Sequence, residues 1–134
     1  MKKNPYVTIF TPNYNCARFI SETIESILNQ TYENFEYIII DDCSTDRSWQ
    51  IIQNYANKDK RIKIYRNKKN LGIVRNRNKG FKKRSPQSKY FVIIDSDDVS
   101  LKNRIELQVR FLEDNPYYGL VGSNVIIIDE NSKL

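Results

Sequence analysis

Apolar residues along the chain follow two alternating patterns. Short runs rich in β-branched and aromatic residues predict strands, because these side chains favour extended structure. Between the runs, apolar residues recur every three or four positions, which is typical of amphipathic helices. The predicted strands are Tyr6–Phe10, Tyr37–Ile40, Arg61–Arg66, Tyr90–Ile94 and Leu120–Ile128, the last either continuous or divided at Gly122-Ser123.

Four helices are predicted between the strands. The second can be capped by Ser44 or Asp46, and the third is a basic helix over Ile73–Lys83. The fourth stops before Asn115-Pro116, because the residue before a proline disfavours helical backbone. The apolar residues that mark the first, second and fourth helices are Phe19, Ile20, Ile24, Ile27 and Leu28; Ile51, Ile52, Tyr55 and Ala56; and Ile105, Val109 and Leu112.

This alternation predicts an α/β fold. Strand–helix–strand units form right-handed crossovers between parallel strands, so we expect a mainly parallel, Rossmann-like sheet with flanking helices. The 134 residues suit one domain. Such a domain rarely closes soon after a strand, and we therefore expect residues 1–134 to be an incomplete domain.

Composition narrows the chemistry. The chain has no histidine, which excludes Ser-His-Asp and Cys-His catalysis within it. Cys16 and Cys43 are far apart and indicate neither a disulfide framework nor a zinc site. The net charge of +6 favours anionic partners, although a solvated basic surface explains it equally well. No apolar run approaches the roughly 20 residues that span a bilayer, and no signal peptide is recognisable, so we expect a cytoplasmic protein.

Polar residues gather directly after the predicted strands. In an open parallel sheet, ligands bind beyond the carboxyl ends of the strands, and these ends share one edge. An aromatic ring, amides, two groups of acids and nearby bases would meet there, which predicts a ligand site. The four segments are Thr11–Asn15, Asp41–Asp46, Asn67–Gly72 and Asp95–Asp98.

Three residues in these segments have both a functional and a structural interpretation. Asp42 can accept hydrogen bonds from a base N–H or a ribose hydroxyl, and we favour this over a role in the turn. Asp46 is more simply a helix cap. Tyr14 lies among Asn and Pro residues, which favours an exposed ring that stacks on a base over a core side chain.

Three acids, Asp95, Asp97 and Asp98, follow the fourth predicted strand. Two carboxylates about 4 Å apart repel each other by roughly 4 kcal/mol near a protein surface, so a positive charge should lie nearby. Residues i and i+2 of an extended strand point the same way. Asp95 and Asp97 could therefore hold Mg²⁺ or Mn²⁺ together with a diphosphate. Alternatively, the acids cap the helix after Ser100 or pair with Arg104.

Other polar features are less specific. The basic residues from Arg75 to Arg84 are most simply a solvated helix face, and Arg77 is best placed to contact a phosphate. No GxGxxG follows the first strand and no GxxxxGK[ST] occurs, which disfavours a nicotinamide cofactor and a P-loop NTPase. Nucleic acid is not expected as a partner, because no nucleic-acid-binding motif is present.

These motifs and their order resemble the inverting family-two glycosyltransferases of the GT-A fold, over nearly the whole chain. The resemblance implies a nucleotide-diphosphate-sugar donor, often a uridine diphosphate sugar, and a glycan or lipid-linked acceptor. The matching stretches are VTIFTPNYN (Val7–Asn15), SETIESILNQTYENFEYIIIDDCSTDRS (Ser21–Ser48), NLGIVRNRNKG (Asn70–Gly80), YFVIIDSDD (Tyr90–Asp98) and LEDNPYYGLVGSNV (Leu112–Val125).

The resemblance also implies roles for single residues. The segment Pro12-Asn13-Tyr14 and Asp42 match positions that hold the base, and Arg77 matches one near the donor. The DxD-type acids Asp95 and Asp97 match positions that serve the ribose and a Mn²⁺ or Mg²⁺ ion, with Asp98 as an alternative metal ligand. The ion then stabilises the departing diphosphate.

The chain departs from the family pattern in two places. Cys43 stands where relatives usually have glycine; a positive φ there would strain it, and we expect the turn to adjust with little effect on the site. The family's catalytic base, an Asp or Glu that deprotonates the acceptor hydroxyl, lies further along, beyond Leu134 here. Asp129 and Glu130 come too early to match it.

Two other functions stay open. A non-catalytic nucleotide-binding module or remnant is favoured by the missing base and disfavoured by the intact acids. A sugar-1-phosphate nucleotidyltransferase is disfavoured because TPNYNCARF lacks a Gly-rich loop. Lysines near Lys68 and Lys82 suggest peripheral contact with the inner face of a membrane. The edge near Leu120–Ile128 could pair with another chain.

Overall fold

The computed structural model describes residues 4–133, which form a four-stranded sheet flanked by four helices. None of these helices is long and apolar enough to cross a bilayer. The strands are β1 (Val7–Asn13), β2 (Phe35–Asp41), β3 (Ile62–Arg66) and β4 (Tyr90–Ile93). The helices are α1 (Ile20–Leu28), α2 (Ser48–Ala56), α3 (Ile73–Lys83) and α4 (Arg104–Asp114).

The sheet has the order β3-β2-β1-β4, and all its pairings are parallel. This confirms the predicted fold class. The chain places β1, β2 and β3 side by side in one direction and then returns to put β4 on the other side of β1. This reversal of strand order leaves a crevice beyond the carboxyl ends of β1 and β4. α/β sheets bind ligands in such crevices.

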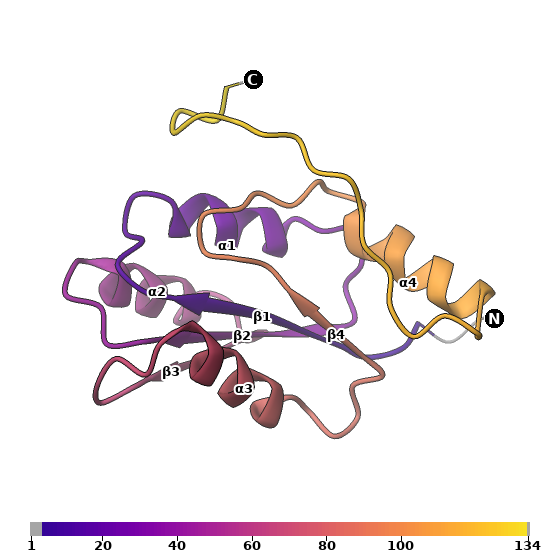
Figure 1. Ribbon diagram of the computed structural model, residues 1–134, viewed down its shortest axis with the longest axis horizontal. Coiled ribbons are helices and arrows are strands. Elements are labelled where there is room, and N and C mark those ends of the chain that lie inside the picture. Colours follow the sequence, from indigo (N-terminus) through magenta and orange to yellow (C-terminus); the bar gives the residue numbers. More distant parts are fainter. Residues whose placement is uncertain (1–3, 134) are drawn as a thin grey trace.

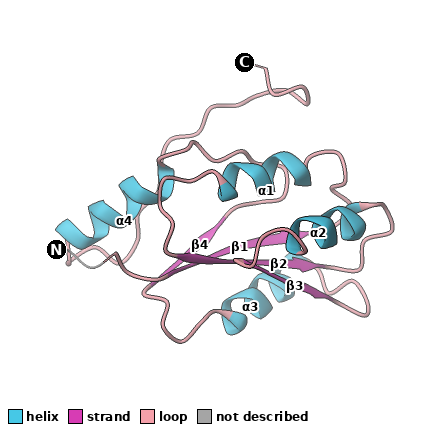
Figure 2. Ribbon diagram, turned by 180° about the vertical axis from the view of Figure 1, so that it is seen from behind, coloured by secondary structure: helices cyan, strands magenta, loops and turns pink. Residues whose placement is uncertain are grey.

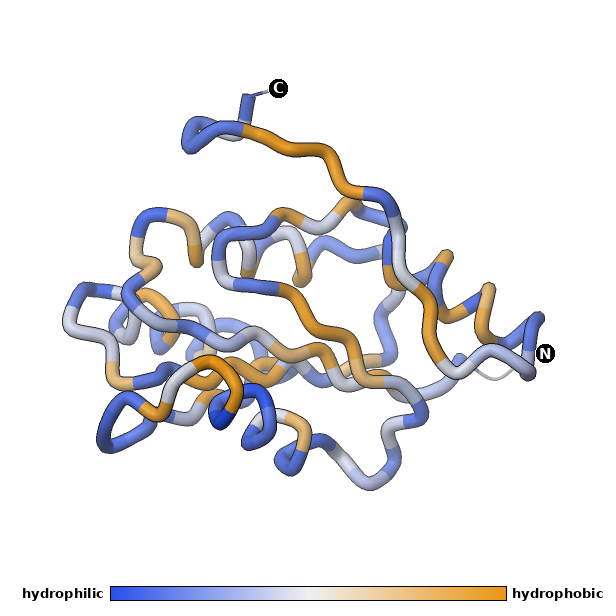
Figure 3. Tube along the Cα trace, viewed as in Figure 1, coloured by the Kyte–Doolittle hydropathy of each residue, from blue (hydrophilic) through white to orange (hydrophobic). Residues whose placement is uncertain are grey.

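The helices cover both faces of the sheet (Figures 1 and 2). α1 and α2 lie on one face and α3 lies on the other. The larger apolar core lies on the α1 side, and Figure 3 shows apolar runs along the strands of the sheet. It includes Val7, Ile9, Ile20, Ile24, Ile27, Tyr37, Ile39, Ile52, Ile105 and Val109.

A smaller core lies between the sheet and α3. Phe10, Ile38 and Ile40 are buried there, because alternate side chains of a strand point to opposite faces. The position of α3 against this core depends on Gly80. A Cβ at Gly80 would lie 2.3 Å from a ring carbon of Phe10, so only glycine allows the helix to approach so closely.

β1 extends further than predicted, through Pro12 to Asn13 instead of ending at Phe10. The carbonyl of Phe10 accepts from Ile94 N–H on the β4 side, and that of Asn13 accepts from Asp42 N–H on the β2 side. Backbone groups alternate between sides along a strand, so Pro12 turns its missing N–H toward the β4 side, past the last bond to that strand. Proline is therefore tolerated, and the strand continues toward the crevice.

The strand predicted over Leu120–Ile128 is not formed. This segment has no regular structure, and Leu120, Val125 and Ile127 are each more than four-fifths exposed. Figures 1 and 3 show this apolar end of the chain running away from the sheet. An apolar run becomes a strand only where its backbone groups find a ladder partner, and no strand within residues 4–133 lies beside it.

Candidate functional site

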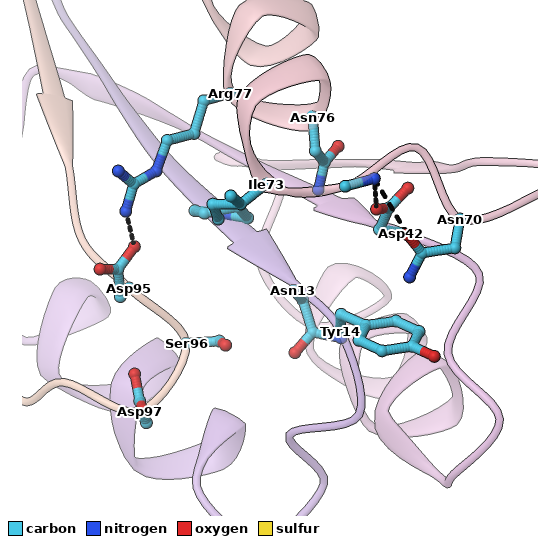
Figure 4. Close-up of a pocket in the computed structure, with 12 residues that line it drawn as sticks. Asn13, Tyr14, Asp42, Asn70, Ile73, Asn76, Arg77, Asp95, Ser96 and Asp97 are labelled. Atoms are coloured by element: carbon cyan, nitrogen blue, oxygen red, sulfur yellow. Dashed lines mark hydrogen bonds and ion pairs between the residues drawn. The ribbon is translucent and has the colours of Figure 1, made fainter.

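A pocket of about 500 Å³ opens at the carboxyl ends of the strands. It lies at the crevice between β1 and β4, with the start of α3 forming one wall (Figure 4). Its volume is in the range of small-molecule sites. The residues that line it are Pro12, Asn13, Tyr14, Asp42, Asn70, Gly72, Ile73, Asn76, Arg77, Asp95, Ser96 and Asp97.

The pocket collects the predicted site residues from separate parts of the chain. All of them except Asp98 line it. Tyr14 is 50% exposed, which leaves its ring available for stacking. Asp98 follows directly after the lining residue Asp97 but is not part of the wall. The structure thus places these residues together, and their contacts with a ligand stay predictions.

Asp42 holds the loop between β3 and α3. Its Oδ1 accepts hydrogen bonds from Nδ2 of Asn67 at 2.7 Å and from the N–H of Leu71 at 2.9 Å, and its Oδ2 accepts from the N–H of Gly72 at 2.9 Å. The residue is 3% exposed. A carboxylate has about four acceptor sites, so these bonds use most of its capacity. Asp42 therefore shapes the pocket by fixing the loop, a role that the sequence did not indicate.

The start of α3 is fixed at the pocket by two further residues. Gly72 caps the helix with φ 80° and ψ 161°, a backbone conformation that is essentially restricted to glycine. Asn76 is buried and donates from Nδ2 to the carbonyl of Ile40 at 3.1 Å. The positive end of the helix dipole therefore faces the pocket, which favours an anionic ligand there.

Arg77 makes an ion pair at the pocket. Its Nη2 donates to Oδ1 of Asp95 at 2.6 Å (Figure 4), and its predicted contact with a phosphate stays a prediction. Its Nε is buried and has no partner within residues 4–133. Arg77 thus supplies part of the positive charge that was predicted near the acids. A metal ion would therefore have to neutralise fewer carboxylates than the sequence indicated.

The acids do not lie on an extended strand as predicted. β4 ends at Ile93, and the N–H of Asp98 donates to the carbonyl of Asp95 at 3.2 Å, which closes a turn. A strand's alternation therefore does not aim Asp95 and Asp97 at one point. Figure 4 shows them on either side of Ser96, both at the pocket.

The acids fit only a metal site that is shared with a ligand. No three acidic or cysteine side chains among residues 4–133 converge on a common point. Mg²⁺ and Mn²⁺ are hard ions that prefer oxygen ligands, and Mg²⁺ commonly binds through one or two carboxylates with water and substrate phosphates completing its coordination. Asp97, which is exposed at the pocket, suits such an incomplete site, whereas Asp95 is already paired with Arg77.

Asp98 keeps an unfavourable charge in the folded chain. Partial burial raises its pKa above the ordinary value, and the neighbouring carboxylates of Asp97 and Asp95 raise it further. Arg104 lowers this pKa without cancelling the rise. Arg104 makes no ion pair with an acid within residues 4–133, so the alternative prediction that the acids pair with Arg104 is not confirmed. Negative charge therefore still accumulates beside the pocket.

The turn after β2 contains a structural acid and a strained cysteine. Asp46 accepts a hydrogen bond from the N–H of Ser48, the first residue of α2, and another from the N–H of Ala17, each at 2.9 Å. Asp46 thus has a structural role, but it is not the predicted helix cap, because the N-cap of α2 is Arg47, which makes no side-chain cap hydrogen bond. Cys43 has φ 66°, so the turn keeps the left-handed backbone instead of adjusting as expected.

Asn13 is the pocket residue with the most unusual environment. It is 1% exposed, and its Nδ2 donates to Oδ1 of Asp41 at 2.8 Å. This bond turns Oδ1 of Asn13 the other way, where it has no partner among residues 4–133. The sequence placed Asn13 in a strand-end segment, but only the bond to Asp41 defines which of its side-chain atoms is left unpaired.

Comparison with known proteins agrees with this fold. Residues 8–134 match the model of glycosyl transferase family 2. The chain belongs to this family. This confirms the resemblance that the sequence motifs indicated.

Three known proteins illustrate the relationship. An uncharacterized glycosyltransferase of Haemophilus influenzae is 42% identical over 97% of this chain and 40% of its own length. Putative teichuronic acid biosynthesis glycosyltransferase TuaG of Bacillus subtilis is 38% identical over 81% of this chain and 42% of its own. The crystal structure of S. aureus TarS residues 1–349 in complex with UDP-GlcNAc has a TM-score of 0.75 and 27% identity, over 90% of this chain and 37% of that one. The chain thus spans less than half the length of each.

Proposed function

We propose that this chain is the donor-binding part of a glycosyltransferase that moves a sugar from a uridine diphosphate sugar to a glycan or lipid-linked acceptor. The observation that carries the proposal is the pocket between β1 and β4, where Tyr14, Asp42, Arg77 and Asp97 meet from separate segments. An aromatic ring, buried acceptors and acids at the carboxyl edge of a parallel sheet suit a base, a ribose and a diphosphate. Family membership supports this reading.

The base would stack on the ring of Tyr14, with Pro12 behind it in the wall. Its edge would meet Oδ1 of Asn13, which is buried without a partner among residues 4–133. Leaving such an acceptor unpaired costs about 1–3 kcal/mol, so a ligand N–H at this position would be favourable. Uracil has a ring N–H that can donate in this way, which supports uridine over bases without one.

The other end of the donor would lie at the acids. Asp95, held in place by Arg77, would contact the ribose, and Asp97 would share a Mn²⁺ or Mg²⁺ ion with the diphosphate. When bound, such an ion supplies Lewis-acid stabilisation of the departing diphosphate. The positive end of α3 adds favourable electrostatics at the same place.

Transfer also needs a carboxylate that removes a proton from the acceptor hydroxyl. Asp129 and Glu130 lie in the exposed C-terminal segment and do not line the pocket. We therefore expect the chain alone to bind a donor without transferring its sugar. We also propose that it does so on the cytoplasmic side of the cell. The name of the relative TuaG supports a cell-surface glycan as the acceptor class.

Calorimetric titration of uridine diphosphate, with and without Mn²⁺, tests the proposal. We expect Mn²⁺-dependent binding by the wild-type chain. Asp97→Asn should weaken this binding at least about tenfold, because it removes a charged metal ligand. The control Glu33→Gln removes an exposed acid that does not line the pocket, and it should bind like the wild type.

Other outcomes would count against the proposal. Absence of binding by a folded wild-type chain would reject a working donor site. Equal binding by Asp97→Asn and the wild type would reject the metal role of Asp97. Sugar transfer by the chain alone, measured with a radiolabelled donor and a panel of glycan acceptors, would contradict the expected lack of turnover.

A further inference from the structure

Positive and negative charges occupy different parts of the molecule. Thirteen of the 22 Lys and Arg residues lie between residues 60 and 94, and none of the 16 Asp and Glu residues does. The rest of the chain carries the nine other basic residues and all of the acids, which is a net charge of −7. The segment 60–94 forms β3, α3 and β4, and α3 lies on the opposite side of the sheet from α1 and α2 (Figure 1).

The outer side of α3 combines this charge with exposed apolar residues. The buried residues of the helix are Asn76 and Gly80, whereas Val74 is 68% and Phe81 49% exposed. A surface helix of a soluble protein normally has the opposite arrangement, with its larger apolar side chains buried. We call this outer side the α3 face; its residues are Val74, Arg75, Asn78, Phe81, Lys82 and, directly after the helix, Arg84.

Helical spacing groups the residues of the α3 face. Val74 and Phe81 are seven positions apart and therefore lie on one side of the helix, two turns from each other. Arg75 and Lys82 have the same spacing and form a parallel basic row. The guanidinium carbon of Arg84 lies 4.0 Å from the ring centre of Phe81, so charge and apolar surface are in direct contact at the end of the helix.

The basic groups of the α3 face are not neutralised by nearby acids. Within residues 4–133, Arg75, Lys82 and Arg84 have no carboxylate within ion-pair distance. Other cations of the same segment are paired, for example Lys63 with Glu36 at 2.5 Å. The charge of the α3 face is therefore available to an external anionic partner.

We propose that the α3 face docks on the surface of a membrane that contains anionic lipids. Basic residues beside exposed apolar ones are typical of helices that lie in a lipid interface, and each Lys or Arg near an anionic bilayer adds to the attraction. A soluble polyanion would also attract the charges, but Val74 and Phe81 would gain nothing from it. Because Ile73 and Arg77 of the same helix line the pocket, docking holds the pocket next to the membrane. The inference does not depend on the proposed function.

Co-sedimentation of the full chain with lipid vesicles tests the docking. We expect binding to phosphatidylcholine vesicles that contain about 30% phosphatidylglycerol, and none to phosphatidylcholine alone. Raising the salt from about 0.1 M to about 1 M should weaken binding, because the screening length falls from about 10 Å to about 3 Å. The double variant Arg75→Gln with Lys82→Gln should reduce the partition coefficient roughly 25-fold, at about fivefold per charge.

Two further variants make the result specific to the α3 face. Lys58→Gln with Lys102→Gln removes two exposed charges from outside segment 60–94 and should bind nearly like the wild type. Val74→Gln keeps the charge but removes an apolar contact, and it should weaken vesicle binding without changing the retention of the chain on heparin. Circular dichroism checks that every variant is folded.

Three outcomes would overturn the inference. Equal binding to neutral and anionic vesicles, or no binding to either, would remove the role of charge. Equal losses in the two double variants would mean that net charge, and not the α3 face, is responsible. Vesicle binding by Val74→Gln that matches the wild type would indicate a soluble polyanion as the partner instead of lipid.

Discussion

Two loop residues near the pocket have left-handed backbone, and the chain supports only one of them with hydrogen bonds. Asn15 has φ 49°, and its side-chain oxygen accepts from the N–H of Thr45 at 2.8 Å. Asn tolerates this backbone because its short polar side chain can bond locally. Cys43 has φ 66° and lacks that advantage. Its Cβ crowds the backbone at a cost of about 1–2 kcal/mol.

Replacing Cys43 by glycine should therefore stabilise the fold. Cys43→Gly removes the crowding, and the greater freedom of glycine in the unfolded chain offsets about 0.5–1 kcal/mol of the gain. We expect a net increase of about 0.5–1 kcal/mol in the free energy of unfolding by urea denaturation. Cys43→Ala is the matched control, because it removes the thiol but keeps the Cβ. Equal stabilisation by both variants would assign the effect to the thiol.

At the scale of elements, a buried acid of β2 is hydrogen-bonded to both neighbouring strands, β1 and β3, and to the segment after α3. Glu36 of β2 is 1% exposed. Its Oε1 accepts from the hydroxyl of Thr8 and from the N–H of Ser85, each at 2.6 Å, and its Oε2 accepts from Nζ of Lys63 at 2.5 Å. Burial alone would raise the pKa of Glu36, but these hydrogen bonds together hold it below the ordinary value of 4.5.

The stability that Glu36 contributes should depend on pH. Because the folded pKa is lower than the unfolded one, the ionised carboxylate stabilises the fold fully above pH 4.5 and progressively less as the pH falls through the folded pKa. Glu36→Gln should lower the free energy of unfolding at neutral pH by about 1–3 kcal/mol. Denaturant titrations should show this difference narrowing below about pH 4.

An exposed acid provides the control for this pH effect. Glu33→Gln changes an exposed residue three positions away and should leave both stability and its pH dependence nearly unchanged. Glu36→Gln could instead lower the free energy of unfolding by the same amount at every pH, even well below the ordinary carboxyl pKa of 4.5. That result would mean that the shape of Glu36, and not its ionisation, stabilises the fold.

The elements also indicate where prediction from sequence succeeds. α3 has the predicted bounds, Ile73 to Lys83, because its helical tendency is local. β1 was predicted too short, because Pro12 normally ends a strand. Whether proline interrupts a strand depends on which side its missing N–H faces and on where the neighbouring strand ends. That information is absent from the local sequence.

At the scale of the whole molecule, the segment after α4 leaves apolar surface uncovered. Val125, Ile126 and Ile127 are 84%, 68% and 89% exposed. β4 is at the edge of the sheet, and edge strands with free backbone groups can pair with other chains. Contiguous exposed apolar residues favour association for the same reason. We therefore expect the chain to self-associate as its concentration rises.

A single charge in this segment should reduce the association. Ile127→Lys places an ammonium group in the apolar run, and sedimentation velocity over a concentration series should show a smaller increase in mean mass than for the wild type. Leu101→Lys adds the same charge at an isolated exposed residue of another loop and serves as the control. A wild-type chain that stays monomeric, or equal behaviour of the two variants, would show that this segment does not drive association.

The sequence by itself determined the kinds of element and their order as far as α4, and the edge of the sheet at which polar residues meet, because periodicity and strand-end chemistry are local properties. It also identified Tyr14, Asp42 and Asp97 as residues of the site. Tertiary structure alone decided that Arg77 pairs with Asp95, that Asp42 secures the β3–α3 loop, and that the acids lie in a turn. These features depend on which distant groups compete for the same donors and acceptors once the strands are packed, and no local pattern records that competition.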